Sequence, residues 1–166
     1  RRSEVILHPG VGEDCSAVEV GEDEVLVFSV DPITATDKGA GNFAVHVTAN
    51  DLASSGAEPI GIMTSIILPP RTCERKLREL MQEIEYACNG LGIEIMGGHT
   101  EISDVVNRPV ITVTGVGKVK KGKLVSTGGL KPGDELVMTK WAGLEGTAII
   151  AAEERTAFRN IAGGIS

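Results

Sequence analysis

Three aspartates in the first third of the chain have the residue type and surroundings of metal ligands. Asp14 lies at the entrance of an expected strand, Asp31 at the exit of another, and Asp51 on an expected helix. Each is flanked by small or apolar residues, a context that buries side chains, and a buried carboxylate needs a partner. Several carboxylates that converge where lysine is scarce indicate a divalent cation, and oxygen-only ligands favour Mg²⁺ over zinc. The alternative is that Asp14 and Asp51 cap a turn and a helix.

A second candidate group is the stretch "MGGHTEIS" at residues 96–103. Gly97 and Gly98 follow an expected short strand, where free backbone N–H groups can approach a phosphate, and Thr100 and Glu101 stand beside them. A simple turn is the alternative for the glycine pair. His99 is a candidate ligand or acid–base group, and a hydrogen-bonded loop histidine is the alternative. The sequence has neither a Walker A pattern nor a G-x-S-x-G elbow.

Composition limits the class of protein. The chain has 166 residues, about one domain, with 42% hydrophobic and 3% aromatic residues and a net charge of −7. Residues 1–60 carry eleven acidic against three basic residues, so the acidity is concentrated there. Nucleic acid and anionic membranes are therefore not expected partners. The three cysteines show no Cys-x-x-Cys spacing, which favours reduced thiols and a cytoplasmic protein. No membrane span or signal peptide is visible, and the opening Arg1-Arg2 suggests a fragment.

Hydrophobic periodicity predicts an interleaved series of strands and helices, hence an α+β or mixed α/β class. Asp31-Pro32 is expected to end the third strand, because proline cannot continue a central ladder. The expected strands are Val5–His8, Cys15–Val20, Glu24–Val30, Gly61–Leu68, Ile93–Met96, Val110–Val119 and Glu135–Lys140. The expected helices are Phe43–Ser55, Cys73–Asn89 and Leu144–Glu154, the second with one apolar stripe. Trp141 is expected to pack near a domain edge.

Five motifs in order resemble the N-terminal domain of the AIR synthase-related (PurM-like) superfamily. They are "HPGVGEDCSAVEV", "SVDP", "FAVHVTANDLASSGAEP", "GGHTEIS" and "LKPGDELVMTK". This group includes aminoimidazole ribonucleotide synthase, thiamine-monophosphate kinase, selenophosphate synthetase and the HypE hydrogenase-maturation proteins. "ANDLASSGAEP" with "TKWAGLEGTAIIA" looks most like the HypE type. The resemblance places the domain at residues 1–153 and makes residues 154–166 a linker or the start of a missing C-terminal domain.

The resemblance implies a mixed, mainly antiparallel sheet with helices on one face, which pairs with a second copy into a β-barrel. It also implies ATP and Mg²⁺ in a cleft lined by the motif acids. The implied ATP-binding residues are Asp14, Asp31, Asn50, Asp51, Gly97, Gly98, His99 and Thr100. The implied metal ligands are Asp14, Asp31, Asp51 and Glu101. Two positions depart from the family pattern: relatives often have Asp or Glu at the position of His99, and a lysine at the position of Asn42. Asp14 is then held by the metal–nucleotide site, whereas Glu13 faces the turn or solvent.

These implications lead to one functional expectation with two rivals. The expected function is Mg-ATP-dependent activation, by phosphorylation, of an amide or other oxygen acceptor in a HypE-like protein. The acceptor would be a small molecule or a protein tail, and the partners would be a second copy and a maturation protein. One rival is a thiamine-monophosphate kinase-like phosphotransferase, weakened because the loop 33–42 lacks a histidine. The other is a non-catalytic dimerisation or partner-docking module.

Overall fold

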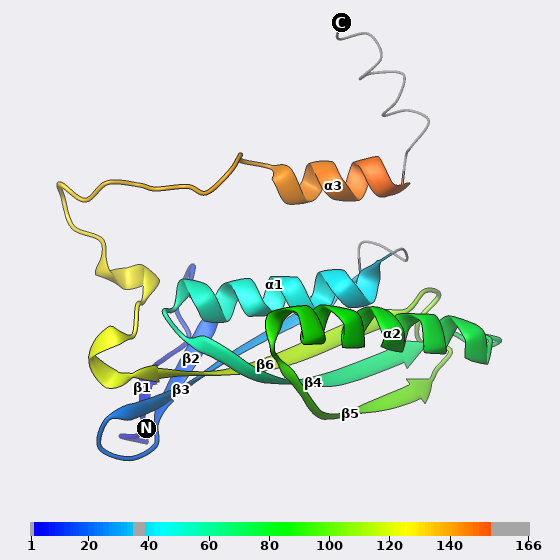
Figure 1. Cartoon of the computed structure of the whole chain (residues 1–166), viewed down its shortest axis with the longest axis horizontal. Helices are drawn as coiled ribbons and strands as arrows, with labels where there is room; N and C mark the ends of the chain where they lie inside the picture. Colours follow the sequence, from blue (N-terminus) through cyan, green and yellow to red (C-terminus); the bar gives the residue numbers. More distant parts are fainter. Residues whose placement is uncertain (1, 35–38, 154–166) are drawn as a thin grey trace, which may run out of the picture.

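The computed structural model describes residues 2–34 and 39–153, in which a six-stranded sheet carries two helices on one face (Figure 1). This arrangement confirms the predicted α+β class. The strands are β1 (Val5–Leu7), β2 (Cys15–Glu19), β3 (Glu24–Ile33), β4 (Glu58–Leu68), β5 (Glu94–Ile102) and β6 (Val110–Lys120). The helices are α1 (Ala40–Ser54), α2 (Glu74–Leu91) and α3 (Leu144–Glu153). Among the described residues, no helix has the length and apolar character needed to cross a membrane.

The strands follow the order β1-β2-β3-β6-β4-β5 across the sheet. All neighbouring pairs are antiparallel except β4 and β5, which are parallel and joined through α2. A parallel pair needs such a crossover, whereas β2 and β3 need only the short turn at Gly21. Because β3 and β4 both run antiparallel to β6, the strands β3, β4 and β5 point the same way. Their C-terminal ends therefore meet at one border of the sheet.

Alternation along the strands creates the core beneath α1 and α2. The helix-facing side of the sheet carries Val113 and Ile111 on β6 and Ile62 and Ile66 on β4, all fully buried. Gly115 lies beneath α1, where an added Cβ would overlap the side chain of Thr48. The missing side chain thus lets α1 lie close against the centre of the sheet.

The first turn of α1 is stabilised from outside its own sequence. Its N-cap residue, Gly39, provides no side-chain hydrogen bond. Instead the carboxylate of Glu83 on α2 accepts a 3.0 Å hydrogen bond from the backbone N–H of Gly41. A negative group at a helix N-terminus also interacts favourably with the helix dipole. Contact between the two helices is close, because a Cβ at Gly41 would lie 2.7 Å from the carbonyl oxygen of Leu80.

The prediction that Asp31-Pro32 ends the third strand was wrong. β3 continues through Pro32 to Ile33, and Asp31 pairs with Val113 of β6. The neighbouring strand β2 stops where Cys15 pairs with Ser29, so the end of β3 has a partner on one side only. Proline is tolerated at such an edge because its missing N–H interrupts no ladder.

Two further strand predictions also differ from the structure. The glycine pair after residue 96 does not leave the sheet, because β5 runs on to Ile102 along its parallel partner β4. Residues 135–140, predicted as a strand, form none in the part of the chain that the structure describes. Their apolar side chains are exposed, since no described strand lies beside them to complete a ladder.

The region after β6 leaves the sheet. After β6 the chain forms two short 3₁₀ turns, Lys121–Lys123 and Thr127–Gly129, and then follows an extended path to α3, which lies apart from the sheet beyond α1 (Figure 1). Trp141, expected to pack, is 78% exposed. The helix predicted at Leu144–Glu154 is present as α3. The proposed linker at 154–166 and part of the loop 33–42 lie outside the described residues.

Candidate functional site

Two of the three predicted aspartates meet at a buried serine. The Ser29 hydroxyl lies 2.9 Å from Oδ2 of Asp51 and 3.2 Å from Oδ2 of Asp31, and it donates to these carboxylates. Ser29 and Asp31 are two residues apart on β3, so they project from the same face of the sheet. α1 crosses this face and brings Asp51 to it. The sequence motifs did not indicate Ser29 as a site residue, although its two-residue spacing from Asp31 in "SVDP" places both side chains on one face of a strand.

Burial and the neighbouring carboxyl groups favour the protonated form of Asp51. Burial, a hydrogen bond with Asp31, and the charges of Asp31 and Asp14 raise the pKa of Asp51 to about 6, although the Ser29 hydroxyl opposes the rise. Burial is the largest of these causes. Asp14 is therefore close enough to act on Asp51 through space, but its side chain is exposed rather than buried as expected.

Cys15 explains how the loop that carries Asp14 is held near α1. The Cys15 thiol donates a 3.4 Å hydrogen bond to the backbone carbonyl oxygen of Asp51. Burial, followed by the charges of Asp51, Glu13 and Asp14, raises the pKa of this thiol, although a side-chain hydrogen bond with Ser55 opposes the rise. The thiol is therefore kept neutral and serves as a buried contact between β2 and α1.

Glu13 has a different position from the one expected. Its Oε2 accepts hydrogen bonds from the backbone N–H of Thr127 at 3.1 Å and from the Thr127 hydroxyl at 2.9 Å. Glu13 thus attaches the acidic loop to the segment that follows β6, instead of facing only the turn or solvent. A cavity of about 110 Å³ lies at this junction, and Asp14 is among its lining residues.

The glycine segment lies three strands away from Asp31 across the sheet. Across the sheet, Asp31 pairs with Val113, Val113 with Thr64, and Thr64 with Gly98 of β5. Three strand spacings correspond to roughly 14 Å. Within one chain, the structure therefore does not bring Gly97, Gly98, His99, Thr100 and Glu101 to the aspartates.

Packing alone accounts for glycine at position 98, because an added Cβ would overlap the carbonyl oxygen of Thr64. His99 and Glu101 are both exposed, and Nε2 of the histidine lies 3.5 Å from Oε2 of the glutamate. The outer edge of β5 has no partner strand in the described part of the chain. Asn50, the neighbour of Asp51 on α1, is exposed.

The donor set fits a metal that is shared with a phosphate rather than one enclosed by protein. Among residues 2–34 and 39–153, no group of three or more His, Cys, Asp or Glu residues is arranged to hold a metal ion. The chain does offer a carboxylate pair, Asp31 and Asp51, beside the Ser29 hydroxyl. Mg²⁺ is commonly held by one or two carboxylates while phosphates and waters complete its shell.

Curated relatives match most of this chain. A putative hydrogenase expression/formation protein of Methanocaldococcus jannaschii is 30% identical over 157 residues, which is 89% of this chain and 47% of that protein. The carbamoyl dehydratase HypE of Cupriavidus necator is 30% identical, over 92% of this chain and 45% of its own length. The thiamine-monophosphate kinase of Methanospirillum hungatei is 33% identical, over 82% and 44%. The chain spans about half the length of these relatives.

Solved structures share the fold. The HypE–HypF complex aligns with a TM-score of 0.72 at 24% identity, covering 84% of this chain and 47% of that chain. AaThiL complexed with AMPPCP and TMP aligns with a TM-score of 0.64 at 21% identity, covering 72% and 40%. The family model described as AIR synthase related protein, N-terminal domain, matches residues 12–119. The match includes β2 to β5, all but the last residue of β6, and both packed helices, so the chain belongs to the AIR synthase related family through its N-terminal domain.

Proposed function

We propose that this chain is the ATP-binding N-terminal half of a HypE-like enzyme that activates an amide or other oxygen acceptor by phosphorylation. The observation that carries the proposal is the pair of carboxylates, Asp31 and Asp51, that share the Ser29 hydroxyl. Two like charges held together, with no basic partner among the described residues, are costly unless a cation or a proton joins them. The family match and the HypE relatives make a Mg²⁺–nucleotide the proposed occupant.

Each residue has a proposed role in this site. Asp31 and Asp51 would hold Mg²⁺, Ser29 would orient both carboxylates, and Asp14 would add negative charge from the adjoining loop. The bound Mg²⁺ would neutralise charge on the phosphates during transfer. In that reaction the γ-phosphorus loses its bond to the bridging oxygen of ADP and gains a bond to the acceptor oxygen. We propose Asn50 as a nucleotide contact from the same chain. We propose the same role for Gly97, Gly98, His99 and Thr100, and a metal-ligand role for Glu101, from a second copy, because within one chain these residues lie three strands away from Asp31.

The comparisons support the choice of cofactor. AaThiL was solved with the nucleotide analogue AMPPCP, and its fold is shared by this chain. The same likeness favours the second candidate, a thiamine-monophosphate kinase-like phosphotransferase, which the 33% identical relative also supports. The HypE–HypF complex supports a proposed maturation partner protein. The free cysteines of the described residues agree with the proposed cytoplasmic location.

The substitution Asp51→Asn tests the proposal. It removes a repelling charge at nearly constant shape, so the melting temperature without ligand should stay equal or rise. It also removes a hard oxygen ligand, so the affinity for Mg·ATP should fall at least tenfold, about 1.4 kcal/mol. Melting curves of wild type and variant, with and without Mg·ATP, measure both effects.

The control is Asp23→Asn, which removes an exposed carboxylate from the β2–β3 turn and should leave the affinity for Mg·ATP unchanged. If Asp51 only caps local structure, Asp51→Asn should cost about 0.5–2 kcal/mol and leave nucleotide binding intact. Equal upward shifts with Mg·ATP in wild type and Asp51→Asn would show that the carboxylate pair is no metal site. No shift in either would favour the non-catalytic docking module.

A further inference from the structure

A pocket lies at the border of the sheet where β3 and β5 end and β6 begins. It has a volume of about 630 Å³ and is lined by Thr34, Asp104, Val105, Val106, Asn107, Arg108 and Val110. We call it the edge pocket. Its size is within the usual range for small-molecule sites, and it combines an apolar wall with a few polar groups. Neither the sequence motifs nor the proposed nucleotide site uses any of these residues.

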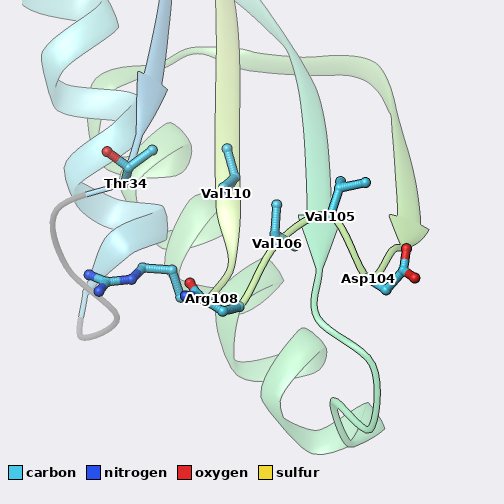
Figure 2. Close-up of a pocket in the computed structure, with 7 residues that line it drawn as sticks. Thr34, Asp104, Val105, Val106, Arg108 and Val110 are labelled. Atoms are coloured by element: carbon cyan, nitrogen blue, oxygen red, sulfur yellow. The ribbon is translucent and has the colours of Figure 1, made fainter.

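The two ends of the edge pocket carry opposite charges. In Figure 2 the Arg108 side chain extends toward Thr34, whereas Asp104 lies at the other end, and Val105, Val106 and Val110 stand between them. Arg108 has no ion-pair partner among the described residues. An exposed guanidinium presents a planar set of donors that matches a carboxylate or phosphate in two-point contact. The Arg108 end therefore offers hydrogen-bond donors and positive charge to an oxyanion.

The middle of the pocket is apolar, although it lies open to solvent. Val105 is 78% exposed, while Val106 and Val110 are half-buried. Burial of such apolar surface beneath a ligand is favourable. At the far end the Asp104 carboxylate can accept a hydrogen bond from an amide or ammonium group.

The edge pocket also lies between the two separated parts of the candidate site. Thr34 follows Asp31 by three residues, just past the end of β3, so the two residues are roughly 10 Å apart along an extended chain. Asp104 comes three residues after Glu101, just past the end of β5. A molecule in this pocket would thus lie at the border toward which β3 and β5, the strands that carry the two groups of site residues, both run.

We propose that the edge pocket binds the acceptor of the phosphorylation reaction. The acceptor would be an elongated small molecule with an oxyanion at the Arg108 end, an apolar middle and an amide or amine at the Asp104 end. The role as acceptor site rests on the proposed function, whereas binding of such a molecule rests on the pocket alone. The shared chemistry of the anionic end is a carboxylate or a phosphate.

Two probes of this shape, 4-aminobutyrate and 3-aminopropyl phosphate, test the proposal by NMR titration of the ¹⁵N-labelled chain. We expect saturable shifts of the backbone amides of Thr34 and of residues 105–108 with at least one probe, and the comparison distinguishes carboxylate from phosphate. Butylamine, which lacks the anion, should cause no saturable shift. Arg108→Gln should weaken binding of the better probe about tenfold or more, because it removes a charge-assisted contact to the anionic end of the probe.

The matched control is Lys120→Gln, which removes an exposed cation from the other end of β6 and should leave probe binding unchanged. The absence of saturable shifts at probe concentrations well above a Kd of about 1 mM overturns the proposal. Equal affinity of wild type and Arg108→Gln overturns it as well.

A parallel titration with Mg·ATP separates this proposal from the function on which it rests. Shifts at Ser29 and Asp51 with Mg·ATP, together with probe shifts at residues 105–108, support both. Mg·ATP binding without probe binding overturns only the proposal that the edge pocket binds the acceptor. Probe binding without Mg·ATP binding overturns the acceptor role together with the proposed function. Shifts at residues 105–108 caused by Mg·ATP itself show that the pocket is part of the nucleotide site and overturn its assignment to an acceptor.

Discussion

The chemistry of this chain is concentrated in a few side chains whose neighbours decide their charge. Asp31 and Asp51 lie on different elements, and the Ser29 hydroxyl joins them. Because burial and the neighbouring carboxylates raise the pKa of Asp51, this residue accepts a proton more readily in the folded chain than in the unfolded chain. Proton and Mg²⁺ would therefore compete for the same pair.

This raised pKa predicts a pH dependence of stability. A carboxyl group whose pKa rises from 3.8 to about 6 on folding stabilises the fold fully below the lower value. The contribution is lost as pH rises through about 6, so the free energy of unfolding should fall between about pH 4 and pH 7. Asp51 is partly exposed, and solvent screening reduces the effect to about 1 kcal/mol.

Urea unfolding of wild type and Asp51→Asn across this pH range measures the effect. The slope attributed to Asp51 should disappear in the variant, whereas it should remain in Asp23→Asn. Equal pH slopes of the free energy of unfolding in wild type and Asp51→Asn would contradict the raised pKa.

At the scale of elements, α2 has two functions in the fold. One face covers the sheet through Leu80 and Ile84, and Glu83 on the same helix completes the first turn of α1. Since α1 carries Asp51, the position of the acidic pair depends on how α2 packs. The predicted apolar stripe of residues 73–89 is confirmed in this sense: its buried members Leu80, Ile84, Ala87 and Cys88 belong to the main core.

Leu80→Ala should destabilise the chain by about 2–5 kcal/mol, because the substitution leaves a cavity in a packed core. Leu80 is 8% exposed, whereas Leu91, at the end of the same helix, is 43% exposed. Leu91→Ala is therefore the control and should change stability by no more than about 0.5 kcal/mol. Thermal or urea unfolding measures both, and an unchanged midpoint for Leu80→Ala would contradict the observed packing.

For the molecule as a whole, the main feature is a sheet with one covered and one open face. α1 and α2 both lie on the same side (Figure 1), and no helix of the described residues covers the other side. Met63 on that open side is 50% exposed and pairs with Thr114 of β6. Thr114 pairs in turn with Val30 of β3, which is also exposed. Exposed apolar residues gathered on one face commonly mark an interaction surface.

We expect a homodimer through this open face, the arrangement that the family resemblance implies. Light scattering should give twice the chain mass at micromolar concentration, and Met63→Lys should shift the population toward monomer by placing a charge in the interface. Leu91→Lys, at the exposed end of α2, should leave the mass unchanged. A wild-type chain that stays monomeric at micromolar concentration and above would contradict the expected dimer.

The sequence by itself determined the family, the order of the six strands and three helices apart from the wrongly predicted strand at residues 135–140, and which acidic residues are candidates for the site. These follow from local information: apolar periodicity predicted α2 and β6 almost to their ends, and short motifs such as "NDLASSGAEP" indicated the superfamily. It could also have indicated Ser29, since residues two apart on a strand share a face.

Only the tertiary structure decided which of these residues meet. The end of β3 stays in the sheet past Pro32 because β6 pairs with it as far as Ile33, and Gly97 and Gly98 stay in β5 because β4 lies beside them. Both partner strands are distant in sequence from the residues that they hold. For the same reason the sequence could not separate the aspartates from the glycine segment, nor place Arg108 and Thr34 around one pocket. Pairing between distant strands, which local periodicity does not encode, sets those distances.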